Sequence, residues 1–337
     1  MVEGAGRIRI AVSACVVGEA VRYDGYHRAS RYVTGALSEA FELVPECPEV
    51  GIGLGVPRPK IHLEPGDSGE RLIGSDGRDL TAVMECYAEA TAHRFRRAGV
   101  AGAVLKSRSP SCGLGDARVW DGHRNVGRST GVFARTLRRE APGIPLIRAS
   151  DLGAPALRDD WLTRVFAGAE LSRLEEASTL RMDALFRFQG RWKMALMAHS
   201  EASARRLGRQ LAAATSAGDV LGEYGEGFRA GFAGPTSRGT HANVLERLAG
   251  HLKARIGLRA RQRIQETIRA FREGRAALAA PTRAIAREAR RLGVRSLLDQ
   301  AALESRASVL RYREDVYDGD PAIGTDDRSR GSAANRR

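Results

Sequence analysis

Three cysteines lie in separate turns of the chain, each beside residues that could take part in chemistry. Cys15 follows a serine and an alanine, Cys47 lies between Glu46 and Pro48, and Cys112 ends the run Ser-Pro-Ser-Cys. Thiols kept only for packing usually lie among aliphatic residues, whereas these follow the ends of predicted strands, where ligands and catalytic groups collect in open α/β folds. Three thiolates from three loops could bind three corners of a metal cluster and leave the fourth for a substrate.

The spacing of the cysteines does not by itself identify a metal. They are 32 and 65 residues apart, which fits neither a CxxC zinc ribbon nor a ferredoxin run. The pattern alone leaves two alternatives open, a shared metal or cluster site and three unrelated thiols, because thiolates select zinc as well as iron–sulfur clusters. The fourth cysteine, Cys86, lies inside a predicted helix, and we expect it to be an ordinary buried residue.

Polar groups beside these cysteines suit acid–base chemistry. Glu49 follows Cys47 by two residues and could transfer protons beside a metal-bound substrate. Ser109 and Ser111 supply hydroxyl groups at the third turn, and Lys106 adds positive charge that favours thiolate over thiol.

The elements that must position these turns alternate between strand and helix in residues 1–150. Such alternation predicts an α/β domain in which a parallel sheet carries helices on both faces. The segment 51–59, full of Gly and Pro, predicts a loop. The expected strands are 7–14, 41–45, 100–106 and 144–147, and the expected helices are 31–41, 80–98 and 127–140.

The pattern changes near residue 151, where strand signals give way to helical periodicity. We expect an α/β domain over residues 1–169, an all-α basic domain over 170–317, and a disordered tail over 318–337. Phe188 and Trp192 are expected in the helical core. The helices predicted there are 155–169, 170–217, 244–272 and 283–303, with the Gly-rich segment 222–239 separating two of them.

Positive charge is concentrated in the second half of the chain. The net charge is +14; residues 1–150 hold 21 Lys and Arg against 17 Asp and Glu, and residues 151–337 hold 33 against 23. This asymmetry favours a polyanion-binding module that follows a domain of nearly neutral net charge. The alternative is an arginine-rich surface that is only solvated.

The composition also indicates in which cellular compartment the protein is expected. Hydrophobic residues make up 43% of the chain, and the longest apolar stretch is too short to span a bilayer. The first residues lack the layout of a signal peptide. We therefore expect a cytoplasmic protein without membrane association, in which the cysteines stay reduced.

Residues 8–168 resemble the thiouracil desulfidase (TudS-like) family. In that family, three cysteines hold a 4Fe–4S cluster whose unique iron takes the sulfur of a thiolated base. The resemblance implies that Cys15, Cys47 and Cys112 are these ligands, that Glu49 is the catalytic glutamate, and that Ser109, rather than Ser111, is the catalytic serine. Glu46 departs from the family pattern, which has an apolar residue there. The matching elements are Ser13-Ala14-Cys15, Val21-Arg22-Tyr23-Asp24-Gly25, Cys47-Pro48-Glu49-Val50, Gly53-Leu54, Pro57-Arg58, Leu105-Lys106-Ser107 and Ser109-Pro110-Ser111-Cys112-Gly113.

Residues 183–312 resemble the uncharacterised helical domain that is often fused behind that family. The fused form is similar to tRNA 4-thiouridine desulfidases. This resemblance implies thiolated tRNA as the partner, and redox-neutral hydrolysis of the C–S bond that yields uridine and sulfide. The matching strings are 185–189, 193–200, 241–245 and 281–283.

Two groups of residues are candidates for contacts with this substrate. The first group falls on one predicted long helix and suits RNA: Lys193, His199, Arg205, Arg206 and Arg209. A lone histidine such as His199 is more often a packed residue or an RNA contact than a ligand or an acid–base group. The second group follows the cysteine turns and suits a polar substrate pocket: Tyr23, Asp24, Arg58 and Lys106.

Two other functions compete with this interpretation. One is a desulfidase of free thiouracil or thiouridine, in which the helical domain serves dimerisation. The other is a non-enzymatic RNA-binding regulator that uses an iron–sulfur or zinc site as a sensor. Glu49 and the serines argue against the regulator, because a sensor needs no acid–base group, and the basic second half argues against an enzyme for small molecules alone.

Overall fold

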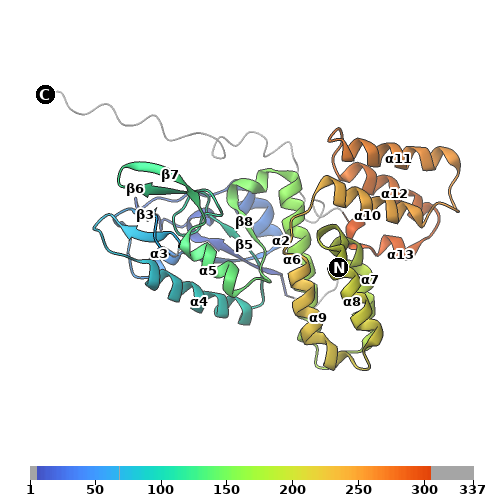
Figure 1. Ribbon diagram of the computed structural model, residues 1–337, viewed down its shortest axis with the longest axis horizontal. Helices are drawn as coiled ribbons and strands as arrows, with labels where there is room; N and C mark the ends of the chain where they lie inside the picture. Colours follow the sequence, from blue (N-terminus) through green and yellow to red (C-terminus); the bar gives the residue numbers. More distant parts are fainter. Residues whose placement is uncertain (1–5, 68, 305–337) are drawn as a thin grey trace.

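A computed structural model describes residues 6–67 and 69–304 of the 337 residues. It consists of an α/β region followed by a helical region, which lie side by side in Figure 1. The tail predicted from residue 318 lies outside the described residues.

Four parallel strands form the first sheet, in the order β2-β1-β5-β8. Because helices cover both faces of such a sheet, its strands are usually continuous runs of apolar residues. β5 shows this most clearly, because all six of its residues are buried. The predicted parallel sheet is confirmed. Its strands are β1 (Arg9–Ser13), β2 (Glu42–Glu46), β5 (Val100–Leu105) and β8 (Leu146–Arg148).

Helices cover both faces of this sheet, as predicted. The buried side chains of α4 (Thr81–Arg97) and α5 (Val132–Glu140) form one core with the sheet. Those of α6 (Pro155–Glu175) and of the segment 32–41 form the core on the other face. The predicted helix 31–41 contains a π-helical stretch, η1 (Val33–Leu37), followed by α2 (Ser38–Ala40).

A second four-stranded sheet was not predicted from the sequence. Its order is β4-β3-β6-β7, in which two antiparallel hairpins, β3–β4 and β6–β7, join through a parallel β3–β6 pair. The helix predicted over 127–140 is therefore wrong at its start: residues up to Ser129 belong to β7, and the helix α5 begins at Val132. The strands are β3 (Ile61–Glu64), β4 (Arg71–Gly74), β6 (Ala117–Asp121) and β7 (Arg124–Ser129).

Among the described residues, the chain beyond β8 contains only helices and connections. The single helix predicted over 170–217 is wrong: the chain breaks after α6, and again at Ser200, whose side chain caps the next helix by accepting the N–H of Ser203. The helix predicted over 244–272 is likewise interrupted. The helices are α7 (Met182–His199), α8 (Glu201–Ala213), α9 (Ala217–Gly231), α10 (Arg238–Gly250), α11 (Leu258–Arg272), α12 (Ala279–Arg291) and α13 (Arg295–Leu298), with 3₁₀ turns η2 (Ala149–Gly153) and η3 (Ala301–Leu303).

The Gly-rich segment 222–239 separates two helices, as predicted, only over residues 232–237, because its first ten residues lie in α9. Glycine serves close packing there: a Cβ on Gly231 would lie 2.7 Å from the side chain of Leu196. The glycines of this segment are typical of a helix breaker, but in the fold they allow close contact with a neighbouring helix.

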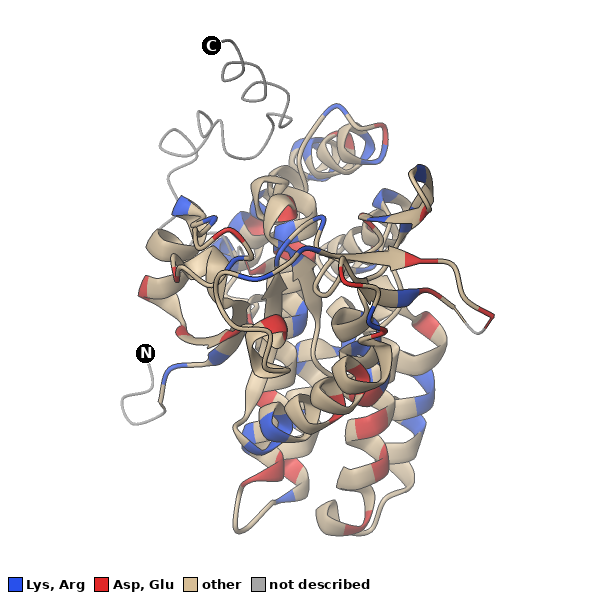
Figure 2. Cartoon of the chain, turned by 90° about the vertical axis from the view of Figure 1, so that its left-hand side faces the viewer, with Lys and Arg blue, Asp and Glu red and all other residues tan. Residues whose placement is uncertain are grey.

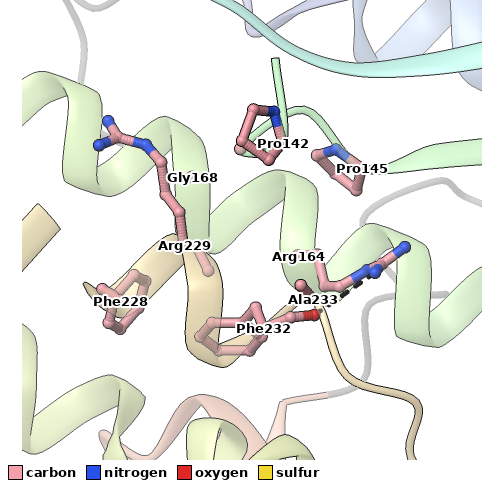
Figure 3. Close-up of a pocket in the computed structure, with 10 residues that line it drawn as sticks. Pro142, Pro145, Arg164, Gly168, Phe228, Arg229, Phe232 and Ala233 are labelled. Carbon is pink, nitrogen blue, oxygen red and sulfur yellow. Dashed lines mark hydrogen bonds between the residues drawn. The ribbon is translucent and has the colours of Figure 1, made fainter. Parts of the chain in front are cut away.

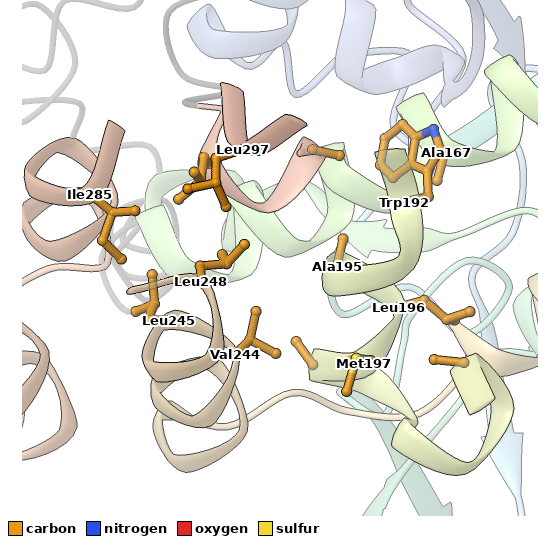
Figure 4. Packing of buried hydrophobic residues seen from close by; sticks show 14 of the residues in the cluster. Ala167, Trp192, Ala195, Leu196, Met197, Val244, Leu245, Leu248, Ile285 and Leu297 are labelled. Carbon is orange, nitrogen blue, oxygen red and sulfur yellow. The ribbon is translucent and has the colours of Figure 1, made fainter. Parts of the chain in front are cut away.

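One hydrophobic core unites the helical region (Figure 4). Trp192 and Phe188 are buried in it, as predicted. The core also includes Leu171 of α6, whereas Trp161 of the same helix packs against the sheet. α6 is thus continuous across residue 169, where the domain boundary was predicted. No described helix is long and apolar enough to cross a membrane.

Candidate active site

The three predicted cysteine turns meet at the carboxyl edge of the parallel sheet. Cys15 lies in α1 (Ala14–Val17) directly after β1, Cys47 is the N-cap of α3 (Pro48–Gly51) directly after β2, and Cys112 lies in the loop between β5 and β6. Loops that follow neighbouring parallel strands converge at this edge, which is where open α/β folds bind ligands. All three thiols line one cavity, here called the thiol cavity. Its lining residues are Ser13, Ala14, Cys15, Val21, Arg22, Tyr23, Glu46, Cys47, Pro48, Glu49, Arg58, Lys106, Ser107, Arg108, Ser109, Pro110 and Cys112.

The three thiols are partly or fully buried from solvent. Burial raises the pKa of Cys15 to about 11, against the opposing effect of Lys106, and burial also raises the pKa of Cys47. Cys112 is the most buried, and desolvation raises its pKa well above the ordinary value despite a hydrogen bond from Ser13. Among the described residues, no three His, Cys, Asp or Glu side chains form a group that could hold a single metal ion.

Cys86 is exposed, so the prediction that it is buried was wrong. α4 buries Met84 and Ala88 against the sheet, and Cys86, midway between them, lies on another side of the helix. It lines no part of the thiol cavity.

Glu49 lies in the first turn of α3 and has both carboxylate oxygens engaged. The Nε and Nη2 atoms of Arg58 donate to its Oε2 at 3.0 and 2.7 Å. The hydroxyl of Ser111 donates to its Oε1 at 3.0 Å. The Arg58 side chain is only 2% exposed, and its Nη1 donates to the carbonyl of Gly55 at 2.9 Å. Charge-assisted bonds from a rigid guanidinium fix the orientation of the carboxylate.

The two candidate serines have different surroundings. Ser111 is fully buried behind Glu49 and does not line the cavity. Ser109 lines the cavity, and its Oγ accepts the N–H groups of Ser111 and Cys112 at 3.2 and 3.1 Å. Because both of those bonds use the oxygen as acceptor, the hydroxyl proton of Ser109 stays available for another partner. The geometry makes Ser111 a positioning group for Glu49 and Ser109 the serine that faces the cavity.

The loop that carries these serines is braced from outside. Arg108 adopts φ 60°, a left-handed conformation that non-glycine residues seldom take, and its N–H donates to Asp116 at 2.9 Å. Gly131 packs against the loop so closely that a Cβ there would lie 2.4 Å from the carbonyl oxygen of Ser111. The Ser-Pro-Ser-Cys turn therefore depends on residues far along the chain, which no local pattern reveals.

Glu46, the residue that departs from the family pattern, lines the cavity with its charge compensated. The hydroxyl of Tyr87 donates to its Oε1 at 2.6 Å, and Arg94 forms an ion pair with its Oε2. Both partners come from α4. Glycine at Gly51 makes room for this contact, because a Cβ there would lie 2.1 Å from the Tyr87 ring.

The remaining residues predicted for the substrate pocket divide into two groups. Tyr23 and Lys106 line the thiol cavity, and burial lowers the pKa of Lys106. Asp24 is not a lining residue: it accepts two hydrogen bonds from Arg22, whose bonding lowers the pKa of Asp24 to about 2. Sequence reasoning missed Arg22 and also Lys60, whose charged groups lie 5.3 and 5.2 Å from the centre of the Tyr23 ring.

The five predicted RNA contacts do not share one helix, so that prediction was wrong. Lys193 and His199 belong to α7, and the three arginines belong to α8, beyond the break at Ser200. The His199 side chain is 2% exposed; its Nδ1 bonds to the carbonyl of Gly234 at 2.9 Å, and its Nε2 lies 3.5 Å from Asp160. Burial lowers the pKa of His199. It is thus a structural residue. The four others are exposed: Lys193, Arg205, Arg206 and Arg209.

A second, shallower cavity lies where α6 and α9 meet (Figure 3). Pro142 and Pro145, from the loop before β8, also line it, and Arg164 bonds there to the carbonyl of Phe232 at 3.4 Å. Neither thiols nor carboxylates line this cavity. Of the two, the thiol cavity carries the reactive groups.

The fold and site define an open α/β protein with a thiol-lined site at the strand ends. A sequence model of the family described as 2-thiouracil desulfurase matches residues 10–148, and one described as "Protein of unknown function (DUF1722)" matches residues 193–305. The chain belongs to the 2-thiouracil desulfurase family and carries a DUF1722 region behind the matched segment.

The chain is also similar to individual proteins. The uncharacterized protein YbbK of Bacillus subtilis (strain 168) is 34% identical over 113 residues, which cover 32% of this chain and 74% of that protein. The uncharacterized protein YbgA of Escherichia coli (strain K12) is 31% identical over 126 residues, covering 36% and 74%. A solved structure of the 4Fe-4S-dependent thiouracil desulfidase TudS is 31% identical, with 45% of this chain and 97% of that chain covered and a TM-score of 0.37.

Proposed function

We propose that this protein is an iron–sulfur-dependent desulfidase that converts 4-thiouridine in tRNA to uridine and sulfide in the cytoplasm. The observation that carries the proposal is the meeting of three family cysteines with Glu49 in one cavity. A packing role would not need three thiols, a fixed carboxylate and a hydroxyl on three different loops. The same grouping argues against a purely structural metal site.

The donor set fits the proposed cofactor. Cys15, Cys47 and Cys112 would hold a 4Fe–4S cluster, because thiolates are the protein ligands of such clusters and three of them leave one iron open. When bound, the cluster would supply a Lewis acid that accepts the substrate sulfur and polarises the C–S bond. The similar protein TudS is itself described as 4Fe-4S-dependent, which supports this choice of cofactor.

The residues of the chain would supply the acid–base chemistry. In the overall reaction, a thiocarbonyl and water give a carbonyl and hydrogen sulfide, so no electrons are gained or lost. Glu49, oriented by Arg58 and Ser111, would take a proton from the attacking water. The Ser109 hydroxyl, which faces the cavity, would donate a hydrogen bond to charge that develops on the substrate.

The preference for RNA rests on charge. Residues 151–337 carry 33 Lys and Arg against 23 Asp and Glu, and Figure 2 shows both signs interspersed along the helices. Many arginines there are paired, such as Arg205 and Arg247 with Glu201. For Arg206 and Arg209, no ion pair occurs within the described residues, and both remain exposed for phosphate contacts. A base within a folded RNA would have to leave its stack to reach the cavity.

Steady-state kinetics with the cluster-loaded full chain test this function. We expect kcat/KM for tRNA that contains 4-thiouridine to exceed that for free thiouracil, with one sulfide released for each uridine formed. Unthiolated tRNA is the matched control and should release no sulfide. If free thiouracil or thiouridine is turned over efficiently and thiolated tRNA is not, the free-base desulfidase is the correct function. Salt-dependent tRNA binding with no desulfuration of any substrate would favour the regulator.

A further inference from the structure

The exposed face of the β6–β7 hairpin carries two arginines directly opposite each other. Arg118 of β6 pairs with Arg128 of β7 in the antiparallel register, and both side chains are exposed. Directly opposite residues have Cβ atoms about 4.5–5.5 Å apart, where like charges are destabilising. Elsewhere in the hairpin, the residue opposite Arg124 in the register is the acidic Asp121.

Within the described ranges 6–67 and 69–304, Arg118 and Arg128 have no side-chain hydrogen bond or ion pair. This sets them apart from arginines such as Arg78 and Arg139, which are bonded to Asp76 and to Glu89. Two uncompensated guanidinium groups at cross-strand distance cost stability unless something negative binds between them. The pair therefore points to an anionic ligand.

The position of the pair ties it to the candidate active site. Asp116, one residue before β6, accepts the N–H of Arg108 in the serine loop. At the other strand, Gly131 lies two residues beyond β7 and donates its N–H to the carbonyl of Gly113, next to Cys112. The end of the hairpin is thus hydrogen-bonded to the turn that carries Cys112. The Arg118–Arg128 pair lies next to the Ala117–Ser129 pair, which is the last pair at this end of the hairpin.

We propose that Arg118 and Arg128 bind phosphate groups of the RNA chain on either side of the nucleotide that enters the thiol cavity. This inference rests on the proposed function, because only a polymeric substrate carries phosphates beyond the reacting nucleotide. Guanidinium groups are suited to phosphate oxygens, which they can bind in pairs. Trp120, two residues along β6 and partly exposed, adds an aromatic surface on the same side of the strand, on which an unpaired base can stack.

The proposed surface is separate from the basic helices. β6 and β7 lie in the part of the α/β region that faces away from α7–α13 (Figure 1). Contacts at the hairpin would therefore hold the segment of RNA nearest the reacting base, while the helical region could contact the rest of the molecule. An RNA shorter than a full tRNA, with a single thiolated nucleotide and its neighbours, would still benefit from the arginine pair.

The test compares two double variants of the full-length, cluster-loaded chain. The first is Arg118→Ala with Arg128→Ala. The matched control, Arg78→Ala with Arg139→Ala, removes the same charge from paired arginines: Arg78 follows β4, at the opposite edge of the second sheet, and Arg139 lies on α5. Binding of thiolated tRNA is measured between low and high salt, together with kcat/KM for that tRNA and for free thiouracil.

For the Arg118 and Arg128 variant, we expect the slope of log Kd against log salt to fall by about 2, one unit for each lost phosphate contact. The kcat/KM for tRNA should fall roughly tenfold or more, while turnover of free thiouracil and the cluster absorption stay unchanged. The control variant should keep the slope of the unmodified chain. An unchanged slope and unchanged tRNA turnover in the Arg118 and Arg128 variant would overturn this inference. Failure of the proposed function is a different result, since the unmodified chain itself would then leave thiolated tRNA intact.

Discussion

Arg58 clasps Glu49 through a single carboxylate oxygen, with its Nε and Nη2 atoms 3.0 and 2.7 Å from Oε2. This leaves Oε1 for the hydroxyl of Ser111. The arginine comes from the loop after α3, and the serine from the loop after β5. A residue from each of two loops thus determines where the carboxylate points.

We expect replacement of Glu49 by Gln to leave the cysteine site intact and to lower kcat by roughly 10²–10⁴, the usual contribution of a general acid or base. Arg58→Lys keeps a positive charge but cannot bind with two nitrogens, so it should lower kcat by an intermediate amount. Turnover and cluster absorption measured side by side check this. Full activity of the Arg58→Lys enzyme would show that the fork geometry is unimportant.

The two serines should respond differently to removal of the hydroxyl. Ser109→Ala deletes the hydroxyl that faces the cavity, and we expect the larger loss of kcat, roughly 10²-fold, typical of a lost transition-state hydrogen bond. Ser111→Ala removes only the group that orients Glu49, so its effect should be smaller and should shrink further in a Glu49→Gln background. Single and double variants measured by kcat provide the comparison. A larger loss in Ser111→Ala than in Ser109→Ala would reverse the two assignments.

Close packing at Gly131 should be essential for the serine loop. A Cβ at this position would lie 2.4 Å from the carbonyl oxygen of Ser111, so Gly131→Ala must displace the loop that bears Cys112. We expect this variant to assemble little iron under anaerobic reconstitution. Gly127→Ala is the matched control, because a Cβ on Gly127 has nothing within 4 Å. Equal iron contents in the two variants would contradict the prediction.

Stability should depend on pH through two histidines of the helical region. Burial lowers the pKa of His199 and of His241. Below the ordinary histidine pKa of about 6.5, the unfolded chain takes up protons that the folded chain refuses, so stability falls as pH decreases. We expect the unfolding temperature to drop between pH 7 and 5.5, and His241→Gln to reduce that drop, whereas His123→Gln at an exposed histidine should not. An unfolding temperature that stays level or rises over this interval would contradict the argument.

Much of the α/β region could be predicted from the sequence, because its strands are short apolar runs that end in reactive turns. β1, β2, β5 and β8 were all expected near their observed positions. The second sheet was missed because its strands bury few residues: β7 is exposed along most of its length, and its glycine and arginines resemble a loop. The helix breaks at Ser200 and near residue 251 were missed because helical periodicity continues on both sides of each turn.

For the site, the sequence predicted the cysteines, Glu49 and Ser109, which the fold brings to one cavity, and Ser111, which lies buried behind Glu49. It did not predict how they are held. The partners of Glu46 come from α4, 41 and 48 residues away, and the link between Ser111 and Glu49 spans 62 residues. Contacts of this kind depend on the tertiary arrangement, and a local pattern carries no information about them. For the same reason, the sequence did not decide whether His199 is buried.

The central claim is that Cys15, Cys47 and Cys112 together hold one iron–sulfur cluster. The most direct measurement is the iron and acid-labile sulfide content of anaerobically reconstituted protein, for the unmodified chain and for Cys112→Ala and Cys86→Ala. We expect about four iron and four sulfide per chain in the unmodified and Cys86→Ala proteins, and little of either in Cys112→Ala. Stoichiometric zinc without iron, or an undiminished cluster in Cys112→Ala, would contradict the account.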